Sequence, residues 1–115
     1  MRAAATFLLL RESAGELEVL MMRRGAGLAF MAGMWVFPGG RVDAADASAA
    51  LRARIPPDAL GGWSGRLRSA QGAPLTDDET LALHVAACRE TFEESGVLLA
   101  RDRTGAPCAA AQGGA

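Results

Sequence analysis

Three glutamates near the end of a helix-forming segment are the residues in this sequence best suited to chemistry. Glu90, Glu93 and Glu94 stand at positions i, i+3 and i+4, a spacing that gathers side chains on one side of an α-helix. Carboxylates held so close repel one another, and such clusters of oxygen atoms are the ligands that Mg²⁺ and Mn²⁺ prefer. The spacing alone leaves two readings open, a divalent metal site or a solvated acidic surface.

The helix that must position these carboxylates is predicted over residues 76–95. Thr76 and Glu79 form the capping-box pattern of a helix start, and Gly96 fits a left-handed C-terminal cap. At about 100° per residue, the glutamates centre on the side opposite an apolar stripe. The stripe, which we expect to face the core, consists of Leu81, Val85, Cys88 and Phe92.

Extended segments are predicted before this helix. Residues 3–11 and 17–24 are apolar runs separated by a polar turn with Gly15, a pattern typical of a β-hairpin. Residues 34–37 form a short third strand that Pro38 stops. An Ala-rich helix is expected over residues 44–54, and another extended segment begins at Val97.

Composition and charge narrow the classes of function. A chain of 115 residues with a formal net charge of -1 holds at most one small domain, and its charge balance does not suggest a nucleic-acid or membrane-surface partner. All 12 basic residues are arginine, so the chain contains no lysine nucleophile. The apolar run at residues 3–10 is short and lacks a cleavage site, so a buried strand is preferred over a signal peptide. We expect a cytoplasmic protein.

Two sequence motifs resemble the two halves of the Nudix box. Residues 89–97 (RETFEESGV) are similar to REUxEExGU, in which U is aliphatic, and residues 37–43 (FPGGRVD) are similar to the Pro-Gly-Gly loop that precedes the catalytic helix. Both motifs occur in the family's order, after two predicted strands. The chain is therefore identified as a member of the Nudix hydrolase family.

The resemblance implies an α/β fold, the Nudix α/β/α sandwich, which is incomplete here. Only the N-terminal strands, an insertion and the catalytic helix are expected, so the chain looks like a truncated product. The Nudix domain would cover residues 1–101, with the insertion at about 44–75. Residues 102–115 form an Ala/Gly-rich tail that we expect to be poorly ordered.

The resemblance also implies a function and a site. Members hydrolyse a diphosphate linkage in a small-molecule substrate with Mg²⁺ or Mn²⁺. Glu90 and Glu94 would be direct metal ligands, while Glu93 would divide its time between the metal and Arg89. A backbone carbonyl of Gly39 or Gly40 would join the metal ligands. The residues expected to bind substrate are Arg24, Gly39, Gly40 and Arg41.

The sequence departs from the family pattern in two respects. About 35 residues are inserted between Gly40 and Arg89, so the first glutamate of the box has no clean equivalent. Counting forward from Gly40 gives Asp46, and counting back from Arg89 gives Leu81. In addition, Thr91 occupies a position that the family fills with an aliphatic residue.

A split box is similar to the branch that contains coenzyme A diphosphatases, which makes coenzyme A or an acyl-coenzyme A a candidate substrate. Residues 20–24, Gly33 and the Pro-Gly-Gly loop partly match that branch's upstream motif, although Arg23 and Arg24 could equally be a solvated strand end. A nucleotide-binding module without catalysis and an inactive fragment remain alternatives.

Three further side chains also allow two readings each. The preferred readings are structural: a partly buried histidine at His84, a core residue at Trp35 beside the Pro-Gly-Gly loop, and a local packing anchor at Trp63. The competing readings are a metal ligand or base at His84 and a stacking platform for a substrate base at Trp35.

Overall fold

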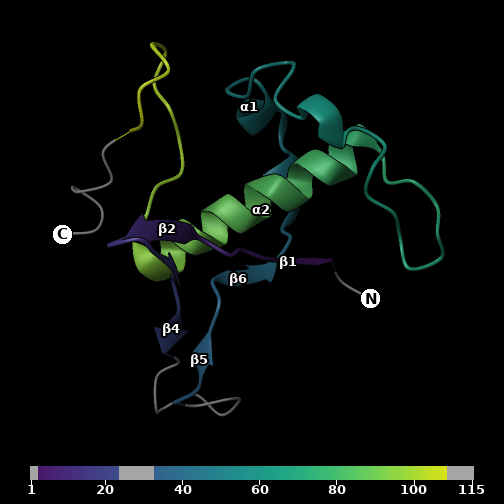
Figure 1. Ribbon diagram of the computed structural model, residues 1–115. Coiled ribbons are helices and arrows are strands. Elements are labelled where there is room, and N and C mark those ends of the chain that lie inside the picture. The colour runs from purple at the N-terminus through teal and green to yellow at the C-terminus, as the bar shows by residue number, and fades with distance from the viewer. Residues whose placement is uncertain (1–2, 24–32, 109–115) are drawn as a thin grey trace. The chain divides into compact units, whose positions relative to one another are not determined.

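The computed structural model describes residues 3–23 and 33–108. Figure 1 draws the helices and strands of the chain, which its contacts divide into two compact units. One unit combines Met1–Ala5 with Arg41–Ala86, and the other combines Thr6–Gly40 with Ala87–Ala115. Within the described ranges, no helix is long and apolar enough to cross a membrane.

Short strands pair two by two. β1 (Ala4–Thr6) pairs with β6 (Gly39–Arg41), β2 (Leu10–Ser13) with β3 (Glu16–Val19), and β4 (Met22–Arg23) with β5 (Trp35–Val36). The last two pairs are antiparallel.

The two long strands predicted before the helix are each divided in the structure. The predicted strand at residues 3–11 becomes β1 and β2, and the one at 17–24 becomes β3 and β4. The reason is a change of pairing partner along the chain. The Phe7 amide donates to the Pro38 carbonyl at 2.7 Å, whereas two residues later the Leu9 carbonyl accepts from the Leu20 amide at 2.9 Å.

The predicted hairpin is confirmed in β2 and β3. Its register places Leu10 opposite Val19 and Arg11 opposite Glu18. The turn uses Ala14 at φ 52° and Gly15 at φ 80°, and two consecutive positive φ angles suit the twist of a two-residue hairpin loop. The polar turn expected from the sequence thus sets the register by its backbone conformation.

The chemistry-bearing helix is α2 (Asp77–Ser95), and both of its predicted ends are confirmed. The Thr76 amide donates to Glu79 Oε1 at 3.0 Å, and the Glu79 amide donates to Thr76 Oγ1 at 3.1 Å, which completes the capping box. At the other end, Gly96 has a φ of 78°, and its amide donates to the Phe92 carbonyl at 2.8 Å. Local capping therefore explains the length of the helix.

Burial along α2 differs from the predicted core face. The buried positions are Thr80, Ala82, Ala86 and Thr91. By contrast, Phe92 of the predicted stripe is 37% exposed, and the other three members of that stripe are only half-buried. The small side chains at the buried positions allow close packing on that side of α2. No described residue completely covers the stripe of larger apolar side chains.

The departure at Thr91 has a local explanation. Its side chain is fully buried, and its hydroxyl donates to the Ala87 carbonyl one turn earlier at 2.7 Å. A buried hydroxyl that is hydrogen-bonded in this way avoids most of its desolvation cost. Threonine can therefore occupy a position that the family fills with an aliphatic side chain.

The inserted segment forms three short helical elements. These are η1 (Ala44–Ala47), α1 (Ala49–Arg52) and η2 (Gly61–Trp63). The single helix predicted over residues 44–54 is broken at Ser48, whose extended backbone lets its hydroxyl accept from the Leu51 amide at 3.3 Å. After α2, the segment that begins at Val97 contains no strand in the described residues, and only an isolated bridge joins Arg101 to Pro107.

Candidate active site

The loop between β5 and β6 forms one side of the candidate site. Pro38 is fully buried, and its carbonyl accepts the Phe7 amide, which fixes the chain just before two glycines. β6 then begins at Gly39, so the backbone of Gly39 and Gly40 is held in an extended conformation. These two residues belong to the same compact unit as the last turns of α2.

Glu94 reaches this loop by a hydrogen bond. The Gly39 amide donates to Glu94 Oε1 at 2.9 Å, across 55 positions of sequence. A hydrogen bond from a backbone amide to a charged carboxylate is short and directional, so it fixes the orientation of the side chain. Glu94 is thus anchored through one oxygen, and its second oxygen is not used in that bond.

Glu90 reaches the same loop by close packing. A Cβ atom placed on Gly40 would lie 2.5 Å from Oε1 and 2.7 Å from Oε2 of Glu90, distances that real Cβ atoms essentially never show. A side chain at position 40 would therefore displace the Glu90 carboxylate from this arrangement. The Glu90 side chain is only 19% exposed as a result.

Arg89 neutralises part of the acidic cluster. Its Nη1 atom donates to Glu90 Oε1 at 3.2 Å and to Glu93 Oε1 at 3.1 Å. The Arg89 side chain is 23% exposed, whereas that of Glu93 is 55% exposed. The structure therefore brings Glu90 and Glu94 to the glycine loop and pairs Glu93 with Arg89.

This donor set suits a hard divalent cation. Glu90 and Glu94 place carboxylate oxygens beside consecutive glycines, where no side chain from the loop intervenes. Within residues 3–23 and 33–108, no group of three or more His, Cys, Asp or Glu side chains converges on one point. Glu90 and Glu94 are therefore the two candidate ligands that lie against the glycine backbone, while Glu93 is paired with Arg89. The metal-ligand roles of Glu90, Glu93, Glu94 and Gly40 stay predictions.

The family follows from a comparison of the whole sequence. Residues 2–113 match the family model described as the NUDT19 Nudix domain. The chain belongs to the Nudix family. The two motifs that flank the insertion are therefore the two halves of one Nudix box, as the sequence predicted, and an α/β fold is confirmed.

Two curated relatives and one solved structure are similar to this Nudix chain. The human acyl-coenzyme A diphosphatase NUDT19 is 36% identical over 78% of this chain and 28% of its own length. The NUDT19 of Gallus gallus is 37% identical over 71% of this chain and 25% of its own. The crystal structure of a NUDIX hydrolase from Alicyclobacillus acidocaldarius is 38% identical, with a TM-score of 0.65, over 94% of this chain and 43% of that one. This chain spans about a quarter of the length of the curated relatives.

Two further residues were predicted to bind substrate, Arg41 and Arg24. Arg41 ends β6 and is exposed, and its role in binding substrate stays a prediction. Arg24 lies outside the described residues. Trp35 is 61% exposed, which contradicts its interpretation as a core residue. β4 and β5 form a sheet of only two strands, and no described element covers the Trp35 side chain completely.

His84 is exposed, so the expectation of partial burial was wrong. Its Nδ1 atom lies 2.8 Å from the Thr80 carbonyl, within one turn of α2, and its ring is 6.0 Å from that of Trp63. The guanidinium of Arg66 lies 5.8 Å from the centre of the Trp63 ring. Trp63 therefore anchors a local cluster in the insertion, as predicted, and His84 packs beside it.

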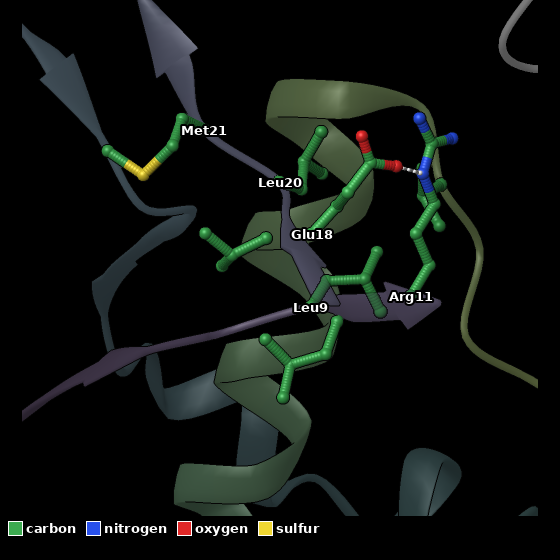
Figure 2. Close-up of a pocket in the computed structure, with 8 residues that line it drawn as sticks. Leu9, Arg11, Glu18, Leu20 and Met21 are labelled. Carbon is green, nitrogen blue, oxygen red and sulfur yellow. Dashed lines mark hydrogen bonds and ion pairs between the residues drawn. The ribbon is translucent and has the colours of Figure 1, made fainter. Parts of the chain in front are cut away.

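An apolar groove lies beside the hairpin, away from the glutamates of the Nudix box. Leu9, Leu20 and Met21 line it, and Arg11 and Glu18 form an ion pair of 2.7 Å at its edge (Figure 2). No member of the predicted active site contributes to its lining. The residues that line the groove are therefore distinct from those assigned to the box.

Only a weak sequence pattern indicated that Asp46 could take the place of the first glutamate of the box. Counting forward from Gly40 along the family pattern reaches this aspartate, but the long insertion made the match ambiguous. The structure buries Asp46 to 1% exposure and hydrogen-bonds its Oδ2 atom to the Asp43 amide at 2.7 Å. Leu81, the residue reached by counting backward, is a half-buried apolar residue that cannot replace a carboxylate.

Proposed function

We propose that this chain provides the metal-binding half of a Nudix hydrolase active site that cleaves a diphosphate linkage. The observation that carries the proposal is the meeting of Glu90 and Glu94 with the backbone of Gly40 and Gly39. Nudix hydrolases generally use divalent metal ions, and the carboxylate oxygens of this site favour Mg²⁺ or Mn²⁺ over softer metals.

Each side chain then has a distinct task. Glu90 and Glu94 would hold the metal, and the Gly39 amide would keep Glu94 in its binding orientation. Arg89 would restrain Glu90 and Glu93 and offset their mutual repulsion. A divalent ion, when bound, supplies positive charge to the diphosphate oxygens and lowers the pKa of a coordinated water.

The substrate would be coenzyme A or an acyl-coenzyme A. The support is the activity for which both NUDT19 relatives are named, acyl-coenzyme A diphosphatase, and the match to the NUDT19 Nudix domain. Hydrolysis would join a water oxygen to one phosphorus while the bond from that phosphorus to the bridging oxygen breaks. The products would be two phosphate monoesters.

A binding measurement with a matched control tests the metal site. Glu94→Gln keeps the shape and exposure of the side chain but removes its charge, so Mn²⁺ affinity measured by calorimetry should fall about 10-fold or more. Glu12→Gln makes the same charge change on exposed β2 and should bind Mn²⁺ like the parent chain. Equal affinity in the parent, Glu94→Gln and Glu12→Gln chains would contradict the assignment.

A turnover measurement separates hydrolysis from binding alone. The probe is acyl-coenzyme A in water enriched in ¹⁸O, with Mg²⁺ or Mn²⁺, followed by mass spectrometry. Hydrolysis at the diphosphate should place one ¹⁸O in one of the two phosphate monoesters, even if turnover is slow. Saturable binding of the substrate without any cleavage would instead support the nucleotide-binding alternative.

A further inference from the structure

Two largely exposed loops of this chain share a sequence pattern. The first loop runs from Arg68 to Pro74 in the insertion, and the second loop runs from Arg101 to Pro107 after α2. Each begins with arginine and ends with Gly-Ala-Pro, and in each the first and last residues form an antiparallel bridge. The first loop belongs to one compact unit and the second loop to the other.

The first loop is closed by bonds among its own residues. The Ser69 amide donates to the Ala73 carbonyl at 2.8 Å, and the Gly72 amide donates to the Ser69 carbonyl at 2.9 Å. The Arg68 Nη1 atom donates to the Gly72 carbonyl at 3.1 Å. Gly72 has a φ of 88°, a conformation that residues with a side chain rarely adopt.

The second loop repeats these bonds position by position. The Asp102 amide donates to the Ala106 carbonyl at 2.8 Å, and the Gly105 amide donates to the Asp102 carbonyl at 3.0 Å. The Arg101 Nη1 atom donates to the Gly105 carbonyl at 2.8 Å. Gly105 has a φ of 87°, so the backbone reverses in the same way in both loops.

One further bond closes each loop from outside. The Leu75 amide donates to the Leu67 carbonyl at 2.8 Å, and the Cys108 amide donates to the Ala100 carbonyl at 2.9 Å. The two loops thus have one conformation although they belong to different compact units. Their shared residues, and not their surroundings, therefore explain the conformation.

The loops differ in the residue that follows the arginine. In the first loop, Ser69 Oγ accepts the Ala73 amide at 3.3 Å. In the second loop, Asp102 Oδ1 accepts the Thr104 amide at 2.8 Å, the Thr104 hydroxyl at 2.6 Å and the Ala106 amide at 3.1 Å. A charged acceptor with several donors makes stronger bonds than a hydroxyl with one donor.

We propose that the pattern Arg-(Ser or Asp)-x-x-Gly-Ala-Pro is a self-contained chain reversal that this chain uses twice. The residue after the arginine sets the rigidity of each copy through the bonds that it accepts. The second copy gives the start of the Ala/Gly-rich segment a fixed course and returns it beside Ala100. This role does not depend on the proposed hydrolase function.

The test exchanges the capping residues between the loops of the complete chain. Asp102→Ser gives the second loop the cap of the first, and Ser69→Asp gives the first loop the cap of the second. Nuclear magnetic resonance measures the exchange with water of two matched amides, those of Leu75 and Cys108. Gly62→Ala is the matched control, because it lies in neither loop and a Cβ atom there meets nothing within 4 Å.

We expect Asp102→Ser to speed exchange of the Cys108 amide about fivefold and to leave that of Leu75 within about twofold of the parent. Ser69→Asp should slow exchange of the Leu75 amide by a similar factor and leave that of Cys108 unchanged. Gly62→Ala should change neither rate. Unchanged rates at both matched amides in the two cap variants, or a change in both loops from one substitution, would overturn the proposal.

A further variant tests the backbone of the second loop. Gly105→Ala places a side chain at a φ of 87°, so the Cys108 amide should lose its protection while the Leu75 amide keeps its parent rate. Parent-like exchange of the Cys108 amide in this variant would show that the reversal does not need glycine, and the proposal would then be wrong.

Discussion

The contact between Gly40 and Glu90 shows how one missing side chain can define a site. Both oxygens of Glu90 lie where a Cβ atom at position 40 would meet them, so the carboxylate rests directly on backbone. Arg89 contributes a hydrogen bond to the same carboxylate at 3.2 Å. Glu90 is therefore held on two sides, which would reduce the conformational entropy lost in binding the proposed metal.

Gly40→Ala should displace the Glu90 carboxylate, because the new Cβ atom would occupy its space, and should weaken Mn²⁺ binding by about 10-fold or more. Gly62→Ala is the matched control, since a Cβ atom at Gly62 meets no atom within 4 Å and its φ is not positive. Calorimetric titration with Mn²⁺ compares the two variants. Wild-type affinity in Gly40→Ala would show that Glu90 does not need its present position.

The start of α2 is stabilised by a pair of reciprocal bonds between Thr76 and Glu79. Thr76→Ala removes the acceptor of the Glu79 amide and should lower the free energy of unfolding by about 1 kcal/mol. Ser64→Ala serves as a control, because it removes a single exposed bond of 2.7 Å to Asp77 and should have a smaller effect. Thermal melts of the three chains at one pH measure the difference, and equal melting temperatures would contradict it.

The same cap predicts a dependence of helix stability on pH. The Thr76 backbone amide, followed by the Thr76 hydroxyl, lowers the pKa of Glu79. Because the pKa is lower in the folded state, this stabilisation is fully present above the ordinary glutamate pKa of about 4.3. It is lost as the pH falls through the lowered pKa of Glu79 in the folded chain. Acid titration followed by circular dichroism should show this step in the parent and not in Glu79→Gln. An identical acid transition in both chains would argue against it.

The insertion is predicted to divide into an essential and a dispensable part. Asp46 is buried in η1, whereas most residues from 53 to 73 are exposed, with η2 as the only helical element among them. Replacing residues 53–73 by a short Gly/Ser linker should preserve Mn²⁺ affinity, because shortening a surface loop changes its closure entropy little. A second deletion that also removes residues 44–52 should lose it. Loss of binding in both would show that the whole insertion is required.

The described part of the whole molecule buries few large apolar side chains. The buried hydrophobic residues other than proline are Ala82 and Ala86, while Leu10 is 53% and Leu17 is 73% exposed. Leu10, Leu17 and Val19 stand on one face of the hairpin, as the register of β2 and β3 shows. Exposed apolar surface of this kind gives little stabilisation and favours association with other apolar surfaces.

The isolated chain should therefore be marginally stable and should bind a hydrophobic dye. The change Leu17→Thr places a smaller, more polar residue with a high strand propensity at an exposed strand position and should reduce dye fluorescence without loss of the hairpin. Ala50→Ser, at an exposed position of α1, is a control that should leave the fluorescence unchanged. A sharp cooperative melt without dye binding in the parent chain would show that this chain is independently stable.

The sequence by itself determined the features that depend on neighbouring residues. The capping box at Thr76, the left-handed cap at Gly96 and the hairpin turn at Gly15 were all predictable, because backbone geometry and side-chain bonds within a few positions decide them. The placement of the three glutamates on one side of the helix likewise followed from the helical repeat. The two motifs then identified the family.

Only the tertiary structure decided which carboxylates meet the glycine loop. Glu94 and Gly39 are 55 positions apart, and no local pattern could show that the amide of one would bond to the other, whereas the pairing of Glu93 with Arg89 follows from helical spacing. The burial of Asp46 and the half-exposure of the apolar stripe on α2 were equally hidden. Contacts between distant segments depend on how the whole chain pairs and packs, and the local preferences that a sequence displays do not contain that information.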